Sequence, residues 1–162
     1  MKKVILSLGT NLGNKLENLK NAIKYLESVP DTEILKISKV YETEPFEVPD
    51  EQDNYYNCCI LLKTTLEPQA LLNICLKIES KMGRKKPYKN ASRIIDIDLI
   101  FYEGITCNKP NLILPHPRTK DRIFVLVPML DILSPGDKLR KKINTYLKNL
   151  NSAEIEEIGF IK

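Results

Sequence analysis

The sequence predicts an α+β fold in which an antiparallel sheet is covered by helices. Two segments with apolar residues at helical spacing, 15–28 and 68–82, alternate with apolar, strand-like runs near residues 4–8, 34–41, 55–66 and 93–102. The order is strand-helix-strand-strand-helix-strand. This is the split βαββαβ arrangement of ferredoxin-like sheets, with both helices on one face.

The first helix has recognisable boundaries. The strand at 4–8 runs into a turn that contains two glycines and two asparagines. Asn14 followed by Glu17 resembles a capping box with asparagine as the cap, and Pro30 limits the helix at its other end. A plain strand-to-helix turn is favoured over a phosphate loop, because neither the Walker pattern nor the dinucleotide fingerprint is present.

The second helix is equally well marked. Residues 43–53, with their prolines and acids, predict a loop between the second and third strands, which we expect to pair. Pro68 suits the first turn of the helix and Gly83 its C-terminal cap. The basic stretch 84–92 then predicts a mobile loop.

The last third should cover the second face of the sheet or extend it. We expect an extended segment at 111–117, a short helix around 119–127 limited by Pro128, and a helix at 137–150. An edge strand at 154–161 completes the expected fold, which is α+β, a ferredoxin-like split βαββαβ antiparallel sheet extended by C-terminal helices. At 162 residues, the chain is expected to form one domain, 1–162.

Composition narrows the function. A net charge of +4 suits an anionic small ligand and falls short of the basic footprint of a nucleic-acid binder. No apolar run reaches the roughly 20 residues of a membrane span. The four cysteines lack Cys-x-x-Cys spacing and are typical of buried thiols in a reducing compartment, so a cytoplasmic protein is expected.

Asp96 and Asp98 are the strongest chemical signal. Alternation along a strand projects both side chains to one face, while Ile95, Ile97 and Leu99 project to the other. Two carboxylates so placed repel each other unless a cation lies between them. A basic series from Arg84 to Arg93 lies just upstream, which suits a polyphosphate bound with a hard divalent cation such as Mg²⁺. The alternative without a function is that both aspartates are solvated on an exposed face of the strand.

Two other classes of function stay open on the residues alone. An RNA-recognition domain of similar architecture would need aromatic or basic residues on the strand that here carries Asp96 and Asp98. A metal-dependent phosphohydrolase would use the same aspartates with water as the acceptor, and would release ADP or phosphate.

Several motifs together resemble one family. Lys89-x-Ala91-Ser92-Arg93-x-x-Asp96-Ile97-Asp98-Leu99-Ile100 resembles the signature of the 6-hydroxymethyl-7,8-dihydropterin pyrophosphokinases of folate biosynthesis. Four further segments match in order between residue 4 and about residue 135, namely Leu8-Gly9-Thr10-Asn11-Leu12-Gly13, Tyr41-x-Thr43-x-Pro45 with Tyr55-x-Asn57, Leu114-Pro115-His116-Pro117, and Arg122-x-Phe124-Val125-Leu126-x-Pro128-Met129.

The resemblance implies an ATP-dependent pyrophosphokinase. It would transfer the terminal diphosphate of ATP to the hydroxymethyl oxygen of the pterin, giving the pterin diphosphate and AMP. Two Mg²⁺ ions are expected with bound ATP. The expected partners are therefore small molecules, ATP and the dihydropterin, with no nucleic acid or membrane, and the chain is expected to be a monomer.

The resemblance also implies the site residues. Asp96 and Asp98 would bind metal, and the catalytic set would be Arg84, Lys86, Lys89 and Arg93, some of them on a loop that closes over ATP. The pterin would contact Thr43, Pro45, Phe46, Tyr55, Asn57 and Phe124. ATP would contact Leu72, Glu79, Arg93, Leu99, His116 and Arg122.

The basic loop departs from the family pattern. It is one residue shorter than the family pattern implies, and Asn90 stands where that pattern has an aromatic residue. Lys86 and Lys89 replace arginines, and lysine supplies charge without a bidentate fork. Pro117 stands where an aromatic residue is expected after the histidine. Which basic residue dominates is therefore left open.

Overall fold

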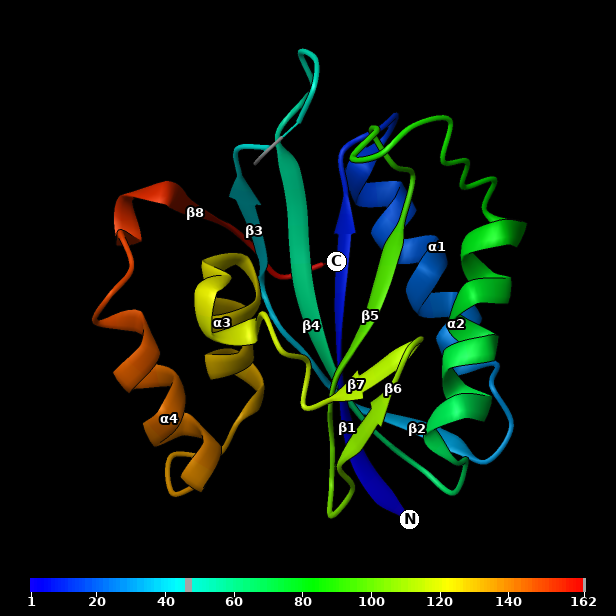
Figure 1. The fold of residues 1–162 in the computed structure, drawn as a ribbon, viewed down its shortest axis with the longest axis vertical. Helices are drawn as coiled ribbons and strands as arrows, with labels where there is room; N and C mark the ends of the chain where they lie inside the picture. Colours follow the sequence, from blue (N-terminus) through cyan, green and yellow to red (C-terminus); the bar gives the residue numbers. More distant parts are fainter. Residues whose placement is uncertain (46–47, 162) are drawn as a thin grey trace.

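The computed structural model describes residues 1–45 and 48–161. A central sheet lies between a layer formed by α1 and α2 and a layer formed by α3 and α4 (Figure 1). The elements are β1 Lys2–Thr10, α1 Lys15–Glu27, β2 Thr32–Ile37, β3 Val40–Thr43, β4 Tyr55–Thr64, α2 Pro68–Lys81, β5 Asp96–Tyr102, β6 Cys107–Lys109, β7 Leu112–Leu114, η1 Thr119–Asp121, α3 Ile123–Ile132, α4 Lys138–Leu147, η2 Ser152–Glu154 and β8 Ile155–Gly159.

The sheet has the predicted ferredoxin-like order. Its strands run in the order β5-β1-β4-β3-β8. β3 pairs with residues 55–57 of β4, and β2 pairs with residues 60–64 of the same strand. Every pairing in the sheet is antiparallel, with β1 between β4 and β5. The predicted fold class, including the pairing of the second and third strands across the loop, is confirmed.

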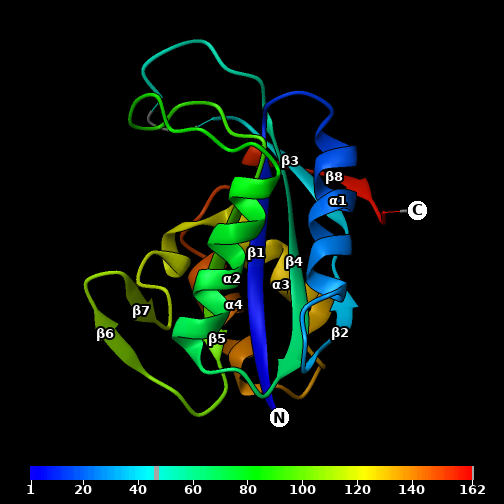
Figure 2. The same cartoon turned by 90° about the vertical axis from the view of Figure 1, so that its right-hand side faces the viewer.

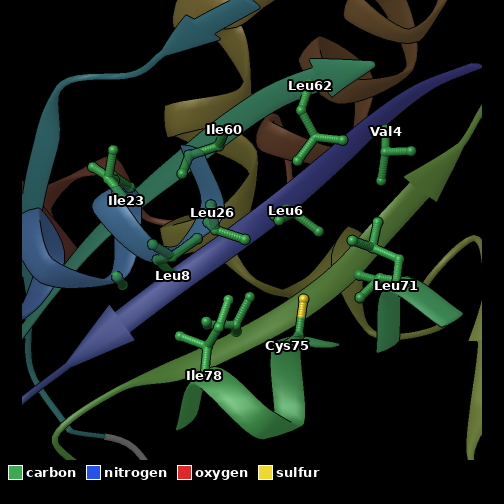
Figure 3. Close-up of a cluster of buried hydrophobic side chains, with 14 of the residues drawn as sticks. Val4, Leu6, Leu8, Ile23, Leu26, Ile60, Leu62, Leu71, Cys75 and Ile78 are labelled. Carbon is green, nitrogen blue, oxygen red and sulfur yellow. The ribbon is translucent and has the colours of Figure 1, made fainter. Parts of the chain in front are cut away.

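The face covered by α1 and α2 is apolar along its length. Leu6 and Leu8 of β1 pack there with Leu26 of α1 and Leu71 of α2, all fully buried, as Figure 3 shows. The predicted cap is present, because the Oδ1 atom of Asn14 accepts a hydrogen bond from the backbone N–H of Glu17 at 3.1 Å. Burial of one apolar stripe on each helix accounts for this layer.

The opposite face is covered only in part. Ile5, Cys59 and Ile100 pack there against α3, while α4 adds Ile143 to the same cluster. Cys59 thus belongs to this second core, whereas its neighbour Cys58 belongs to the core beneath α1 and α2. Alternation along β4 sends the two thiols to opposite faces, as expected.

Two expectations were wrong in detail. The strand predicted at 34–41 is two strands, because the buried Ser38 hydroxyl accepts the backbone N–H of Cys59 at 2.8 Å and donates to the carbonyl of Lys39 at 2.7 Å. Pro128 does not limit its helix but lies inside α3. A proline inside a helix costs ~3 kcal/mol, yet Leu126 and Met129 are buried beside it, and each can contribute about 1.5–3 kcal/mol.

The C-terminal region extends the sheet as predicted. β8 pairs with β3 and forms the edge beyond it, while the β6–β7 hairpin, of which β6 was not predicted, forms a small separate sheet. The loops that follow β3 and α2 reach the same end of the molecule (Figures 1 and 2). Within the described part of the chain, no helix combines the length and apolarity that a bilayer span requires.

Candidate active site

The register of three strands builds the floor of the site. Gly9 of β1 lies opposite Asn57 of β4 on one side and opposite Asp96 of β5 on the other. Two residues earlier in β1, Ser7 lies opposite Asp98 of β5. Directly opposed residues of a sheet share a face, so these side chains all lie on the face that α3 covers only in part.

Gly9 allows a close approach at the centre of this floor. A Cβ atom at this position would lie 3.3 Å from the Oδ1 atom of Asn57 and 3.7 Å from the ring of Tyr55. The absence of a side chain therefore lets both residues lie against β1. Because neighbouring strands lie about 4.8 Å apart, two strand spacings separate Asn57 from Asp96 by about 10 Å.

The two aspartates have different surroundings. Both oxygens of Asp96 are paired, Oδ1 with Arg84 at 2.7 Å and Oδ2 with Arg93 at 2.9 Å. Among the described residues, the cation that pairs with Asp98 is Arg122, whose Nη1 atom is 4.0 Å from its Oδ2 atom. Burial, and then the charge of Asp96, raise the pKa of Asp98 to about 7. Asp98 is thus a carboxylate whose charge lacks a close counterion.

Glu79 and Arg84 form a buried ion pair at the rim of this floor. The Oε1 atom of Glu79 is 2.7 Å from the Nη1 atom of Arg84, and both side chains are 7% exposed. The Oε2 atom of Glu79 accepts the backbone N–H of Ile97 at 2.7 Å, between the two aspartates in sequence. Burial raises the pKa of Glu79, although the Ile97 N–H and Arg84 oppose that shift.

The start of α3 and the segment before it contribute cationic and aromatic side chains to the site. The guanidinium of Arg122 lies over the ring of Phe124, 5.6 Å from its centre. Burial, and then Arg122, lower the pKa of His116, which is therefore neutral near pH 7. The backbone N–H of Arg118 points to the Nδ1 atom of His116 at 3.3 Å, an arrangement that assigns the ring proton to Nε2.

The opposite end of the floor is polar and enclosed. The Nδ2 atom of the buried Asn57 donates to the Oγ1 atom of Thr43 at 2.9 Å. Thr43 lies opposite Tyr55, a half-buried ring at the start of β4, and Pro45 is also half-buried. Phe46, predicted to bind pterin, lies outside the described residues.

A network around Asn11 joins the loops above the floor. Asn11 is buried, and its Nδ2 atom donates to the Oε1 atom of Gln52 at 3.0 Å. Its Oδ1 atom accepts the backbone N–H of Arg93 at 2.9 Å. The hydroxyl of Tyr88 donates to Asp50 across the same two loops. These contacts hold the loop after β3 against the loop after α2.

The loop after α2 borders a cavity of about 370 Å³. Its basic lining includes Lys86 and Lys89, which are exposed, together with Arg84 and Arg93. The two lysines stand at the mouth of the site, whereas the two arginines are held at Asp96 by ion pairs. The predicted basic set is therefore divided between the loop and the floor.

The remaining predicted nucleotide contacts lie apart from the carboxylates. The side chain of Leu99 is buried in the core beneath α1 and α2, on the face opposite Asp98. Leu72 of α2 is partly buried against the same core. The sequence did not predict that Asn11 and Gln52 link the two loops. Each is one of several polar residues in a turn or loop, and no pattern distinguishes it from its neighbours.

The two aspartates have the ligand chemistry that a hard divalent cation requires. Asp96 and Asp98 offer hard oxygen ligands from one strand, and the raised pKa of Asp98 marks a carboxylate that a nearby cation would stabilise. Among the described residues, no group of three or more His, Cys, Asp or Glu side chains could form a metal site by itself. The two carboxylates therefore fit a cation that takes its other ligands from phosphate and water.

Comparison with known proteins identifies the class of protein that this fold and site define. The sequence model of the family described as 7,8-dihydro-6-hydroxymethylpterin-pyrophosphokinase matches residues 5–134. The chain therefore belongs to this family.

Curated relatives agree with this assignment. A Methylorubrum extorquens protein named 2-amino-4-hydroxy-6-hydroxymethyldihydropteridine pyrophosphokinase is 37% identical over 162 residues, which cover 98% of this chain and 99% of that protein. The folic acid synthesis protein FOL1 of Dictyostelium discoideum is 41% identical over 129 residues, or 80% of this chain. Those residues make up only 19% of FOL1, so the chain matches about a fifth of that longer relative.

Solved structures share the fold. The wild-type Plasmodium falciparum HPPK-DHPS chain, solved with SDX-DHP, superposes with a TM-score of 0.68 at 17% identity. The alignment covers 97% of this chain and 47% of the solved one. At that identity the match supports the α+β fold alone.

Proposed function

We propose that the chain transfers diphosphate from ATP to the hydroxymethyl group of 6-hydroxymethyl-7,8-dihydropterin, giving the pterin diphosphate and AMP. The observation that carries this proposal is the row Asn57–Gly9–Asp96 across three strands. It sets a buried amide about 10 Å from a carboxylate on one face of the sheet. A flat bicyclic ring bound at the amide would direct its substituent toward the carboxylates.

Asn57 would recognise the edge of the pterin. Its Nδ2 atom donates to the Oγ1 atom of Thr43 at 2.9 Å and to the carbonyl of Tyr41 at 3.4 Å, so its Oδ1 atom would accept a hydrogen bond from a donor on the ring edge. Tyr55 and Phe124 would stack on the two faces of the ring, each stacked pair contributing about 0.5–1.5 kcal/mol beyond area burial. Thr43 orients the Asn57 amide through its 2.9 Å hydrogen bond, and Pro45 borders the same pocket.

Basic groups would hold the triphosphate. Arg93 is fixed at the floor by Asp96, while Lys86 and Lys89 are exposed on the loop above and can close over the phosphates. His116, neutral near pH 7, would donate its Nε2–H to a phosphate oxygen, and Arg122 would supply charge beside the substrate hydroxyl.

Asp96 and Asp98 would hold two Mg²⁺ ions together with phosphate oxygens and water. When bound, Mg²⁺ neutralises charge on the phosphates and favours ionisation of the attacking hydroxyl. The chain's own contribution is position, since floor and loops would align the hydroxyl with the β-phosphorus and exclude water.

We also propose that residues 1–162 act as one catalytic domain, as a monomer, in the cytoplasm. One sheet includes strands from both ends of the chain, β1 and β8. Three of the four cysteines are buried free thiols, which fits a reducing compartment.

The direct test is to incubate the purified protein with ATP, Mg²⁺ and 6-hydroxymethyl-7,8-dihydropterin and to identify the adenine nucleotide released. AMP that depends on the pterin is expected. ADP, or loss of ATP without pterin, would instead support a phosphohydrolase. Glu33→Gln removes an exposed carboxylate, paired with Lys63 at 3.1 Å on the far part of the sheet, and serves as a control that should retain full activity.

A further inference from the structure

Arg84 is shared between two carboxylates. Its Nη1 atom is 2.7 Å from the Oε1 atom of Glu79 and 2.7 Å from the Oδ1 atom of Asp96. With only 7% of the Arg84 side chain exposed, water competes little for its charge. Its Nε atom is buried and has no hydrogen-bond partner among the described residues, while its Nη1 atom lies close to both carboxylates.

A cation at Asp96 and the guanidinium of Arg84 compete for the same carboxylate. Two positive charges at one oxygen repel each other, so loading the cation requires Arg84 to withdraw from the Oδ1 atom of Asp96. If the buried guanidinium withdrew and had no other carboxylate to pair with, its positive charge would be left without a counterion, which is strongly unfavourable. Glu79 removes that obstacle, because it already binds the same nitrogen.

Glu79 is anchored to stay in place during such an exchange. Its second oxygen accepts the backbone N–H of Ile97 at 2.7 Å, and Ile97 belongs to the strand that carries both aspartates. The carboxylate is therefore tied to β5 by one oxygen and to Arg84 by the other. Both oxygens are engaged inside the protein, which does not suit the direct ATP contact expected from the resemblance.

We infer that Glu79 is a positioning residue that retains Arg84 while Asp96 exchanges this arginine for a divalent cation. The inference rests on the proposed function in one respect, that a cation binds at Asp96. Glu79 touches neither substrate nor cation. It acts by lowering the cost of freeing the Asp96 carboxylate.

The experiment titrates the full, nucleotide-free chain with Mn²⁺ and follows paramagnetic broadening of the backbone amide signal of Ile97 by NMR. Glu79→Gln keeps the shape but removes the charge, so Arg84 binds Asp96 alone and the apparent Mn²⁺ dissociation constant rises about tenfold, as expected for a charged hydrogen bond. Arg84→Met removes the cation that competes at the Oδ1 atom of Asp96, while Arg93 still pairs with Oδ2, so Mn²⁺ binds more tightly than in the wild type.

The double variant isolates the mechanism. If Glu79 acts through Arg84, Glu79→Gln has little further effect once Arg84 is Met, and the double variant resembles Arg84→Met. If Glu79 acted only as a nearby negative charge or as a direct ligand, its removal would weaken Mn²⁺ binding equally in both backgrounds, and that result would overturn the inference. Glu33→Gln controls for loss of a remote charge.

Asp96→Asn separates the two proposals. If this variant loses Mn²⁺ binding but Glu79→Gln binds normally, only the role of Glu79 is overturned. If Asp96→Asn and wild type bind Mn²⁺ alike, the cation site that the proposed function needs is wrong, and the inference falls with it. Should Glu79→Gln fail to fold, Arg84→Met decides, since unchanged or weaker binding in that variant contradicts the competition.

Discussion

The two faces of the sheet contrast in how far they are covered. The face beneath α1 and α2 is closed and apolar, with Leu6 and Leu8 of β1 fully buried. The other face is apolar under α3 and polar beyond it, where Ser7 and Gly9 of the same strand lie between the aspartates and β4. One strand therefore serves as core on one side and as floor of the candidate site on the other.

Because of this difference, we expect substitutions on the closed face to affect mainly stability and those on the open face to affect mainly activity. Residues of the closed face can change only at the expense of packing, whereas the open face can hold a charged side chain at a cost to stability. Asp98 is the clearest case, since burial and the charge of Asp96 raise its pKa to about 7. The folded, metal-free protein then holds this proton more tightly than the unfolded chain does, so ionisation of Asp98 as the pH rises through about 7 lowers stability.

The largest effect is expected for Asp98→Ala. Loss of this carboxylate should lower kcat/KM on the order of a thousandfold, as for removal of a preorganised electrostatic group. Its melting temperature at pH 8 without metal should equal or exceed that of the wild type. Steady-state kinetics and thermal unfolding measure the two quantities, and a near-normal rate at limiting Mg²⁺ would contradict the metal role.

Leu6→Ala tests the closed face. Removing this fully buried side chain should lower the free energy of unfolding by about 3 kcal/mol, through lost burial and the cavity left behind. Ligand affinities of the folded fraction should stay close to wild type. Urea unfolding checks the first expectation and calorimetry the second. A specific loss of pterin affinity would show that the two faces are not independent.

Asn57→Ala should weaken pterin binding about tenfold, because a site built to hydrogen-bond the ring edge then leaves polar groups unpaired. ATP affinity should be unaffected, since Asn57 lies across Gly9 from the carboxylates. Isothermal calorimetry with each ligand distinguishes these results. Equal weakening of both ligands would indicate general distortion of the floor.

Phe124→Ala is expected to have the smallest effect, a loss of about threefold to tenfold in pterin affinity from one stacking contact. The same calorimetric comparison applies, with Phe124→Leu as a control that keeps apolar volume but removes the aromatic ring. If Phe124→Leu binds pterin as tightly as the wild type, stacking is not the reason for the aromatic residue.

Local signals in the sequence predicted most of the fold. Helix caps at Asn14 and Gly83, alternation at Cys58 and Cys59, and the order of elements all act over short distances. The two errors had tertiary causes. The break at Ser38 depends on a hydrogen bond to β4, and Pro128 is tolerated because its helix is buried on the sheet.

The sequence predicted which residues belong to the candidate site better than it predicted their contacts with one another. Alternation placed Asp96 and Asp98 on one face, and the structure agrees. Pairing of Arg84 with Asp96 depends on how the end of α2 docks beside β5, and the link from Asn11 to Gln52 joins residues 41 positions apart. No local pattern encodes such contacts. The assignment of individual residues to pterin or ATP stays a prediction.

The pairing of β8 with β3 has a consequence for how the family can vary. The family match ends at residue 134, yet Ile155–Gly159 forms the outer neighbour of the strand that carries Thr43. A C-terminal segment outside the matched residues 5–134 thereby braces the strand that borders the proposed pterin pocket. Relatives with different tails could then differ in substrate affinity while their recognised motifs stay identical, and exchanging tails between them would be a route to tuning the enzyme without altering any site residue.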